Sequence, residues 1–109
     1  MQRFKKYIDK ELKLANVKDS DQLETFGIIC TTLPDPPEDF DEFEFTTDYG
    51  GQNVVIGVAV QEGKIKRVMF VLADEKEPDV LRPFTEAQLK DFLDQRGEQL
   101  VGFFEYITQ

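Results

Sequence analysis

The stretch from Glu42 to Ala73 reads EFEFTTDYGGQNVVIGVAVQEGKIKRVMFVLA, and it decides the fold. Its first part alternates between aromatic and acidic side chains: Phe43 and Phe45 lie on one side, and the two glutamates on the other. Such alternation with a period of two is typical of a half-buried β-strand. The segment from Glu42 to Tyr49 is therefore predicted to be a strand with its Phe side chains in the core.

Two further apolar runs follow this strand, at residues 53–61 and 65–73. Gly50-Gly51 and Glu62-Gly63 separate the runs, and glycine allows the tight turns that join antiparallel strands. The sequence therefore predicts consecutive hairpins. Residues 54–60 are almost all apolar, which indicates a central strand covered on both faces within one subunit, and hence a monomer. An intersubunit contact would produce the same pattern, so a homodimer is the alternative.

The N-terminal flank predicts one helix and one more strand. Residues 3–15 carry apolar side chains at helical spacing and are predicted to form an amphipathic helix. Residues 17–22 are polar and predict a turn. Residues 23–33 are rich in β-branched and apolar side chains and predict a strand, which the prolines after Leu33 end.

The C-terminal flank begins with a polar connector at residues 74–83. Thr85 and Gln88 have the spacing of a capping box, which predicts the start of a helix there. Gly97 can end that helix. The apolar residues of 100–108 continue the helical phase, but the glycines and the clustered β-formers favour a last strand.

Together these segments predict the α+β class. The expected architecture is an antiparallel meander sheet of four to five strands with an N-terminal helix and a C-terminal helix, in the order α-β-β-β-β-α-β. A chain of 109 residues with 40% hydrophobic side chains has material for one core, so residues 1–109 are expected to form a single acidic domain.

Composition excludes several kinds of chemistry. The chain has no His and one Cys, so it has no His-based triad, no His metal ligand and no thiolate zinc site. Cys30 lies in an apolar run and is expected to be a buried, unreactive thiol. The charged N-terminus and the lack of a long apolar run predict a cytoplasmic protein without a membrane span. No cofactor and no enzymatic activity are expected.

The net charge of −9 is unevenly distributed. Residues 1–18 hold six basic and two acidic side chains, whereas residues 19–63 hold eleven acidic side chains and no Lys or Arg. A dense acidic region is typical of a surface that meets a basic partner, although it can also serve solubility alone. Direct nucleic-acid binding is not expected from so acidic a chain.

The candidate binding segment is residues 35–49, DPPEDFDEFEFTTDY. Carboxylates that steer a basic partner, with an aromatic anchor among them, predict a protein-binding surface. The carboxylates could equally imitate the phosphates of a nucleic acid. A calcium loop fits poorly, because Phe43 and Glu44 occupy positions where the EF-hand pattern needs a ligand and a glycine. The plainest alternative is a solvated loop whose Phe side chains fill the core. The candidate partner-binding residues are Asp35, Glu38, Asp39, Phe40, Asp41, Glu42, Glu44 and Asp48.

The same region resembles the "LPxDY…NGG" stretch of the SUKH superfamily of immunity proteins. The resemblance rests on Leu33-Pro34, Pro37-Glu38-Asp39-Phe40 and Tyr49-Gly50-Gly51. It implies toxin neutralisation as a function and a helix between the two motifs. The chain departs from the family there, because residues 43–47 have the pattern of a strand, and the residues after Gly51 do not match.

The leading hypothesis is a non-enzymatic protein that blocks a basic partner through its acidic face. An immunity protein against a nuclease toxin, or a nucleic-acid mimic, is the expected type. The alternative hypothesis is a small acidic dimeric chaperone or adaptor of a secretion system. The uniformly apolar strand at 54–60 suits that alternative as well.

Overall fold

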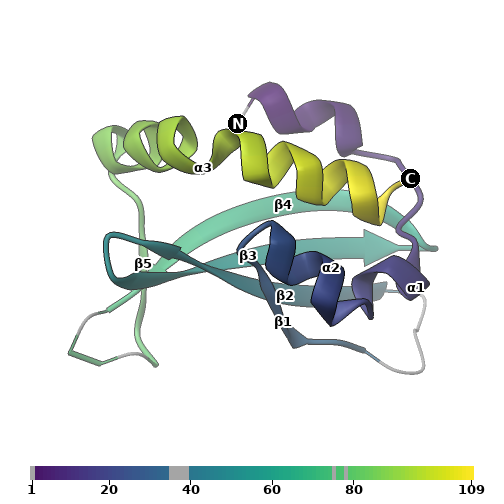
Figure 1. Cartoon of the computed structure of the whole chain (residues 1–109), viewed down its shortest axis with the longest axis horizontal. Coiled ribbons are helices and arrows are strands. Elements are labelled where there is room, and N and C mark those ends of the chain that lie inside the picture. Colours follow the sequence, from purple (N-terminus) through teal and green to yellow (C-terminus); the bar gives the residue numbers. More distant parts are fainter. Residues whose placement is uncertain (1, 35–39, 75, 78) are drawn as a thin grey trace.

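The computed structural model describes residues 2–34, 40–74, 76–77 and 79–109. It shows the predicted α+β fold, with a five-stranded antiparallel sheet in which every strand neighbours the next one in sequence (Figure 1). The strands are β1 (Ile29–Thr32), β2 (Phe40–Tyr49), β3 (Gln52–Gln61), β4 (Lys64–Ala73) and β5 (Leu81–Pro83). The helical elements are the 3-10 helix η1 (Gln2–Tyr7) and the α-helices α1 (Leu14–Val17), α2 (Ser20–Thr25) and α3 (Glu86–Ile107).

The meander from β2 to β4 confirms the central prediction. Phe43 faces Val58 across the first hairpin, and Val58 faces Val68 across the second. Both turns use backbone with positive φ, at Gly50 and Gly51 (58° and 85°) and at Glu62 and Gly63 (53° and 79°). Two consecutive positive-φ residues form the turn whose twist matches that of the flanking strands, and this makes both hairpins tight.

The N-terminal segment is not the continuous helix that its apolar spacing predicted. Helix η1 ends at Tyr7, and Asp9 adopts a φ of 68° that no right-handed helix tolerates. The next residues are extended against the start of β4: the Asp9 N–H donates to Ile65 O at 2.7 Å, and the Ile65 N–H donates to Lys10 O at 2.9 Å. Hydrogen bonding to the edge of β4 therefore determines the backbone conformation of these residues, although their apolar spacing is helical.

The strand predicted over residues 23–33 is also shorter than expected. Residues 20–25 form α2, and the Asp19 side chain caps it by accepting a hydrogen bond from the Gln22 N–H at 3.2 Å. This N-cap lies in the segment that the sequence predicted as a turn. Only Ile29–Thr32 pairs as β1. At the far edge, β5 occupies the last residues of the predicted polar connector.

The predicted C-terminal strand at residues 100–108 is wrong, because α3 runs without interruption from Glu86 to Ile107. The capping box at its start is present, with Thr85 and Gln88 each accepting from the other's backbone N–H at 3.1 Å. The helix continues past both glycines because its apolar stripe remains in phase with the core. The stripe comprises Phe92, Leu93, Leu100, Phe103, Phe104 and Ile107, all buried. Burial of this stripe outweighs the lower helix propensity of glycine.

The two helical glycines allow different neighbours to come close. A Cβ at Gly97 would collide with the guanidinium of Arg3, which donates to the Leu93 carbonyl at 3.4 Å. A Cβ at Gly102 would lie 2.9 Å from the ring of Phe26, which packs near Tyr106 with the ring centroids 6.2 Å apart. Arg3 can rotate away, whereas the packed ring has less freedom to move.

Gly97→Ala is therefore expected to stabilise the protein by up to about 1 kcal/mol, since alanine favours the helix. Gly102→Ala is expected to destabilise it, because the displaced Phe26 ring loses more than propensity restores. Urea unfolding of both variants measures these changes. Destabilisation of equal size in the two variants would contradict the distinction between a flexible and a packed neighbour.

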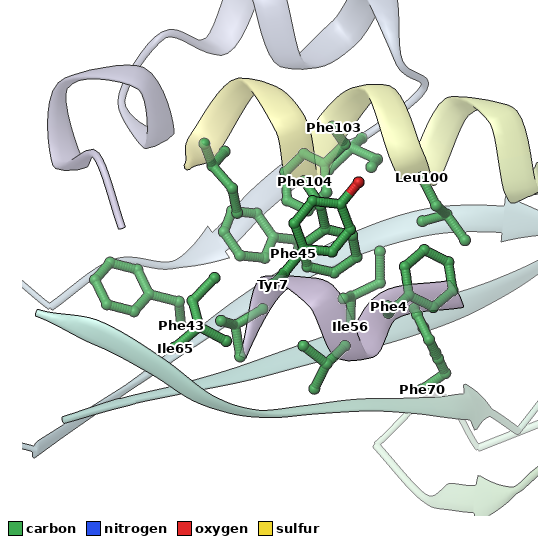
Figure 2. Packing of buried hydrophobic residues seen from close by; sticks show 14 of the residues in the cluster. Phe4, Tyr7, Phe43, Phe45, Ile56, Ile65, Phe70, Leu100, Phe103 and Phe104 are labelled. Atoms are coloured by element: carbon green, nitrogen blue, oxygen red, sulfur yellow. The ribbon is translucent and has the colours of Figure 1, made fainter. Parts of the chain in front are cut away.

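The core lies between one face of the sheet and the helices (Figure 2). Figure 2 shows Leu100, Phe103 and Phe104 of α3 directed toward the side chains of the strands. Phe45 meets Phe103 edge-on with the ring centroids 4.8 Å apart, and Tyr7 stacks on Phe104 at 5.3 Å. As predicted, Phe43 and Phe45 fill this core.

Within the described ranges, the helices cover only this one face (Figure 1), so the expectation that residues 54–60 are covered on both faces within one subunit is wrong. Val54, Ile56, Val58 and Val60 point into the core and are buried. Of the residues that point the other way, Val55 and Gly57 are only partly buried, whereas Ala59 is 4% exposed. No helix of the described residues is long and apolar enough to cross a membrane.

Candidate functional site: the open face of the sheet

The face of the sheet that the helices leave uncovered is called the open face here. Its residues follow from the register, since directly paired residues share a face. One row across the sheet runs Glu42, Ala59, Arg67, and the next runs Glu44, Gly57, Met69. The full set is Ile29 and Thr32 of β1, Phe40, Glu42, Glu44, Thr46 and Asp48 of β2, Asn53, Val55, Gly57, Ala59 and Gln61 of β3, Lys64, Arg67, Met69, Val71 and Ala73 of β4, and Leu81 and Pro83 of β5.

Large apolar side chains are exposed on the open face. Ile29 is 60% exposed, Phe40 59%, Leu81 49% and Met69 41%. They stand around a centre of small or β-branched side chains on β3, of which Ala59 is 4% exposed. Exposed apolar side chains of this size, interspersed with charged ones on one face, make this face a candidate protein-interaction site.

Two of the predicted acidic residues lie together on this face. Glu42 and Glu44 are neighbours on the same side of β2. The Glu44 carboxylate accepts a hydrogen bond from the Thr32 hydroxyl at 2.9 Å. The Glu42 carboxylate leans toward β3, 3.4 Å from where a Cβ on Gly57 would stand. Phe40, the predicted aromatic anchor, begins the same strand on the same side.

Of the other candidate residues, Asp41 does not reach the open face, and Asp48 shares it by register but lies away from Glu42 and Glu44. Asp41 points to the core side and is 8% exposed, so it does not belong to a binding surface on the open face. Asp48 lies at the far end of β2, where Arg96 binds it twice: Nε donates to the Asp48 carbonyl at 3.1 Å, and Nη2 lies 3.7 Å from Oδ2. Asp35, Glu38 and Asp39 lie outside the described residues.

The sequence reasoning missed two cations on the open face, Lys64 and Arg67 of β4. Strict alternation along β4 would place Ile65 and Val68 on opposite faces, yet both are buried in the core. A register shift between Ala59 and Val60 inserts one extra residue in β4 and makes this arrangement possible. The bulge leaves Arg67 directly opposite Ala59 on the open face. The polar pattern KIKR was visible in the sequence, but the bulge that orients it was not.

Cys30 lies on the core side of β1, beside a cavity of about 320 Å³ under α2. The cavity is lined mostly by apolar side chains, among them Val17, Ile28 and Leu33. The thiol is half-buried, and burial raises its pKa. A raised pKa reduces the thiolate population. Cys30 is thus less buried than expected, and its low reactivity stays a prediction.

The described residues contain no cluster of three or more His, Cys, Asp or Glu side chains placed to hold a metal ion. Across the stretch between the two motifs that resemble the SUKH superfamily, residues 40–49 form strand β2 and not a helix. No family model, no curated protein and no solved structure matches this chain.

Proposed function

We propose that the protein is a non-enzymatic cytoplasmic binding protein that docks a basic partner protein through the β2 side of its open face. The observation that carries this proposal is the grouping of Phe40, Glu42 and Glu44 on one uncovered side of one strand. The carboxylates would accelerate association with a basic surface, and the exposed ring would slow dissociation. An immunity protein that blocks the substrate cleft of a nuclease toxin is the type of inhibitor that this design suits.

The rigidity of β2 supports the proposal. The strand pairs over its full length with β3, from Phe40 opposite Gln61 to Tyr49 opposite Gln52. Side chains presented from a paired strand are held at fixed spacing, and this preorganisation lowers the entropy lost on binding. Asp41 and Asp48 are not part of the proposed surface, because one faces the core and the other is paired with Arg96.

The test begins with capture of binding proteins from the native host extract by the immobilised wild-type chain, followed by purification of the protein identified. The double variant Glu42→Gln/Glu44→Gln should slow association with it by about tenfold, and added salt should then matter less. Phe40→Ala should leave association nearly intact and speed dissociation by roughly tenfold or more. Stopped-flow and surface-binding kinetics measure the two rates.

The matched control is Asp94→Asn/Glu98→Gln, which removes the same charge from exposed positions on α3. It should change the association rate far less, since these residues lie on the helical side of the molecule. Equal slowing by both double variants would mean that overall charge is responsible and not the open face. The proposal would then be wrong.

A further inference from the structure

The charges of the open face are divided between its two halves. Glu42 and Glu44 stand on β2, and Lys64 and Arg67 stand on β4, with β3 between them. The strip of β3 that separates the two halves carries the uncharged side chains Val55, Gly57 and Ala59. Among the described residues neither Glu42 nor Arg67 forms an ion pair within the chain. Each half of the face is thus complementary in charge to the other half, and the same holds between two copies of the chain.

Two directions of a two-fold axis place a second copy face to face on this surface with the strands of the two sheets aligned. If the two-fold axis runs across the strands, β2 lies on β2 and β4 on β4, so that acidic side chains meet acidic ones. If the axis runs along β3, β2 of one copy lies on β4 of the other. The charge pattern favours only the second arrangement, since like charges brought together at an interface are strongly unfavourable. It is the aligned packing that sheets adopt in β-sandwiches.

With an axis along β3, a residue of one copy also faces a residue from the same row of the second copy. Glu42, Ala59 and Arg67 share one row. Glu42 therefore meets Arg67 of the second copy, and Arg67 meets Glu42 of the second copy, on either side of the two-fold axis. In such an isologous interface, the same pair of residues forms two contacts, one on each side of the two-fold axis.

Two other rows fit the same placement, whereas the row of Glu44, Gly57 and Met69 sets the Glu44 carboxylate opposite Met69 of the second copy. Phe40 shares a row with Gln61 and Lys64, so its ring meets the stem and ammonium of Lys64 of the second copy. The row of Thr46, Val55 and Val71 continues to Ile29 on one side and Pro83 on the other, which brings Ile29 of one copy onto Pro83 of the second copy.

We infer that the open face is the interface of a symmetric homodimer, with Glu42 and Arg67 as the reciprocal ion pair that fixes its register. The inference goes beyond the proposed function, because it involves no second kind of protein. The two share Glu42 and Phe40, so a basic partner and a second copy would compete for the face. The dimer would cover the exposed apolar residues while no partner is bound.

The test is a charge exchange followed by measurement of mass by sedimentation equilibrium, without any partner. The wild-type chain is expected to have about twice the chain mass at micromolar concentration. Glu42→Lys and Arg67→Glu each place like charges opposite each other twice, and each should weaken dimerisation by at least about tenfold. An equimolar mixture of the two variants should restore the dimer, since every pair in the mixed dimer is again of opposite sign.

Two controls separate the ion pair from simpler effects. The doubly exchanged chain Glu42→Lys/Arg67→Glu should form a homodimer again. Glu98→Lys, with the same change in net charge on the helical side, should leave dimerisation unchanged. The neutralising variants Glu42→Gln and Arg67→Gln should each weaken dimerisation as well. They replace the charge-exchanged variants in the test if circular dichroism shows that either of those does not fold.

A wild-type chain that remains monomeric at high micromolar concentration would overturn the inference. A dimer that the single exchanges leave unchanged, or whose mixture is no tighter than each variant alone, would also overturn it. Binding of a basic partner is tested separately by the kinetic experiment, at a chain concentration at which every variant compared is monomeric, so that loss of the dimer does not alter the association rate.

Discussion

Phe45→Ala is expected to destabilise the protein by about 3–5 kcal/mol, because the truncation leaves a cavity that the surrounding side chains fill only in part. Phe45 is fully buried, and its ring meets Phe103 edge-on at a centroid distance of 4.8 Å. The loss is a large share of the roughly 5–15 kcal/mol that stabilises a typical domain. Urea unfolding measures it as a lower midpoint at an unchanged slope.

Phe40→Ala is the matched control, since it makes the same change at the start of the same strand, where the ring is 59% exposed. Its effect on the unfolding free energy should stay within about 0.5 kcal/mol. Both variants are compared at a protein concentration at which the midpoint no longer changes on dilution. An effect of Phe40→Ala as large as that of Phe45→Ala would show that the two faces of β2 do not differ in burial.

Alkaline conditions are expected to destabilise the wild-type chain through Tyr7. The side chain is 1% exposed, and its hydroxyl donates to Glu105 Oε1 at 2.9 Å. Burial raises the pKa of Tyr7 well above its ordinary value, and the hydrogen bond and charge of Glu105 raise it further. In the unfolded chain the phenol ionises near pH 10. Stability is therefore complete below that pH and falls by up to about 1.4 kcal/mol per pH unit above it.

Tyr7→Phe removes the titrating group and should flatten this alkaline loss, although it lowers stability at neutral pH by removing the bond to Glu105. Tyr106→Phe is the control: the pKa of Tyr106 is also raised, first by its hydrogen bond to Asp19, but its side chain is only partly buried. Thermal midpoints between neutral pH and pH values above 10 compare the three chains. An equal alkaline slope in wild type and Tyr7→Phe would show that Tyr7 is not the group responsible.

Local sequence patterns were sufficient to predict an element correctly wherever the contacts that stabilise it lie close together in the sequence. The hairpin turns at Gly50-Gly51 and Glu62-Gly63, the alternation of β2 and the capping box at Thr85 all depend on residues within a few positions of each other. The structure confirms each of them. The acidic pair on β2 was predictable for the same reason, because alternation alone places Glu42 and Glu44 on one side of the strand.

The predictions of secondary structure were wrong where contacts between residues far apart in the sequence outweigh the local propensity for helix or strand. Gly97 predicted the end of a helix, and Gly97 and Gly102 together favoured a last strand at residues 100–108. Packing of Phe103 and Phe104 on the sheet instead continues α3 past both glycines. Residues 9–11 have helical spacing, yet their backbone is extended because it forms hydrogen bonds with the start of β4. In each case, burial or hydrogen bonding across the molecule contributes more than a residue's own propensity, which amounts to about 1 kcal/mol or less.

By itself, therefore, the sequence determined the α+β class, the meander from β2 to β4 and the position of the acidic strand. Only the tertiary structure decided that the helices cover a single face of the sheet, that Asp41 faces the core, and that the bulge in β4 brings Arg67 opposite Ala59. The physical reason is that a strand's own pattern shows which residues alternate, whereas the elements packed against each side determine which face is covered. The opposed charges of Glu42 and Arg67 lie 25 positions apart in the sequence and share one row of the sheet only after β3 has paired with both neighbours.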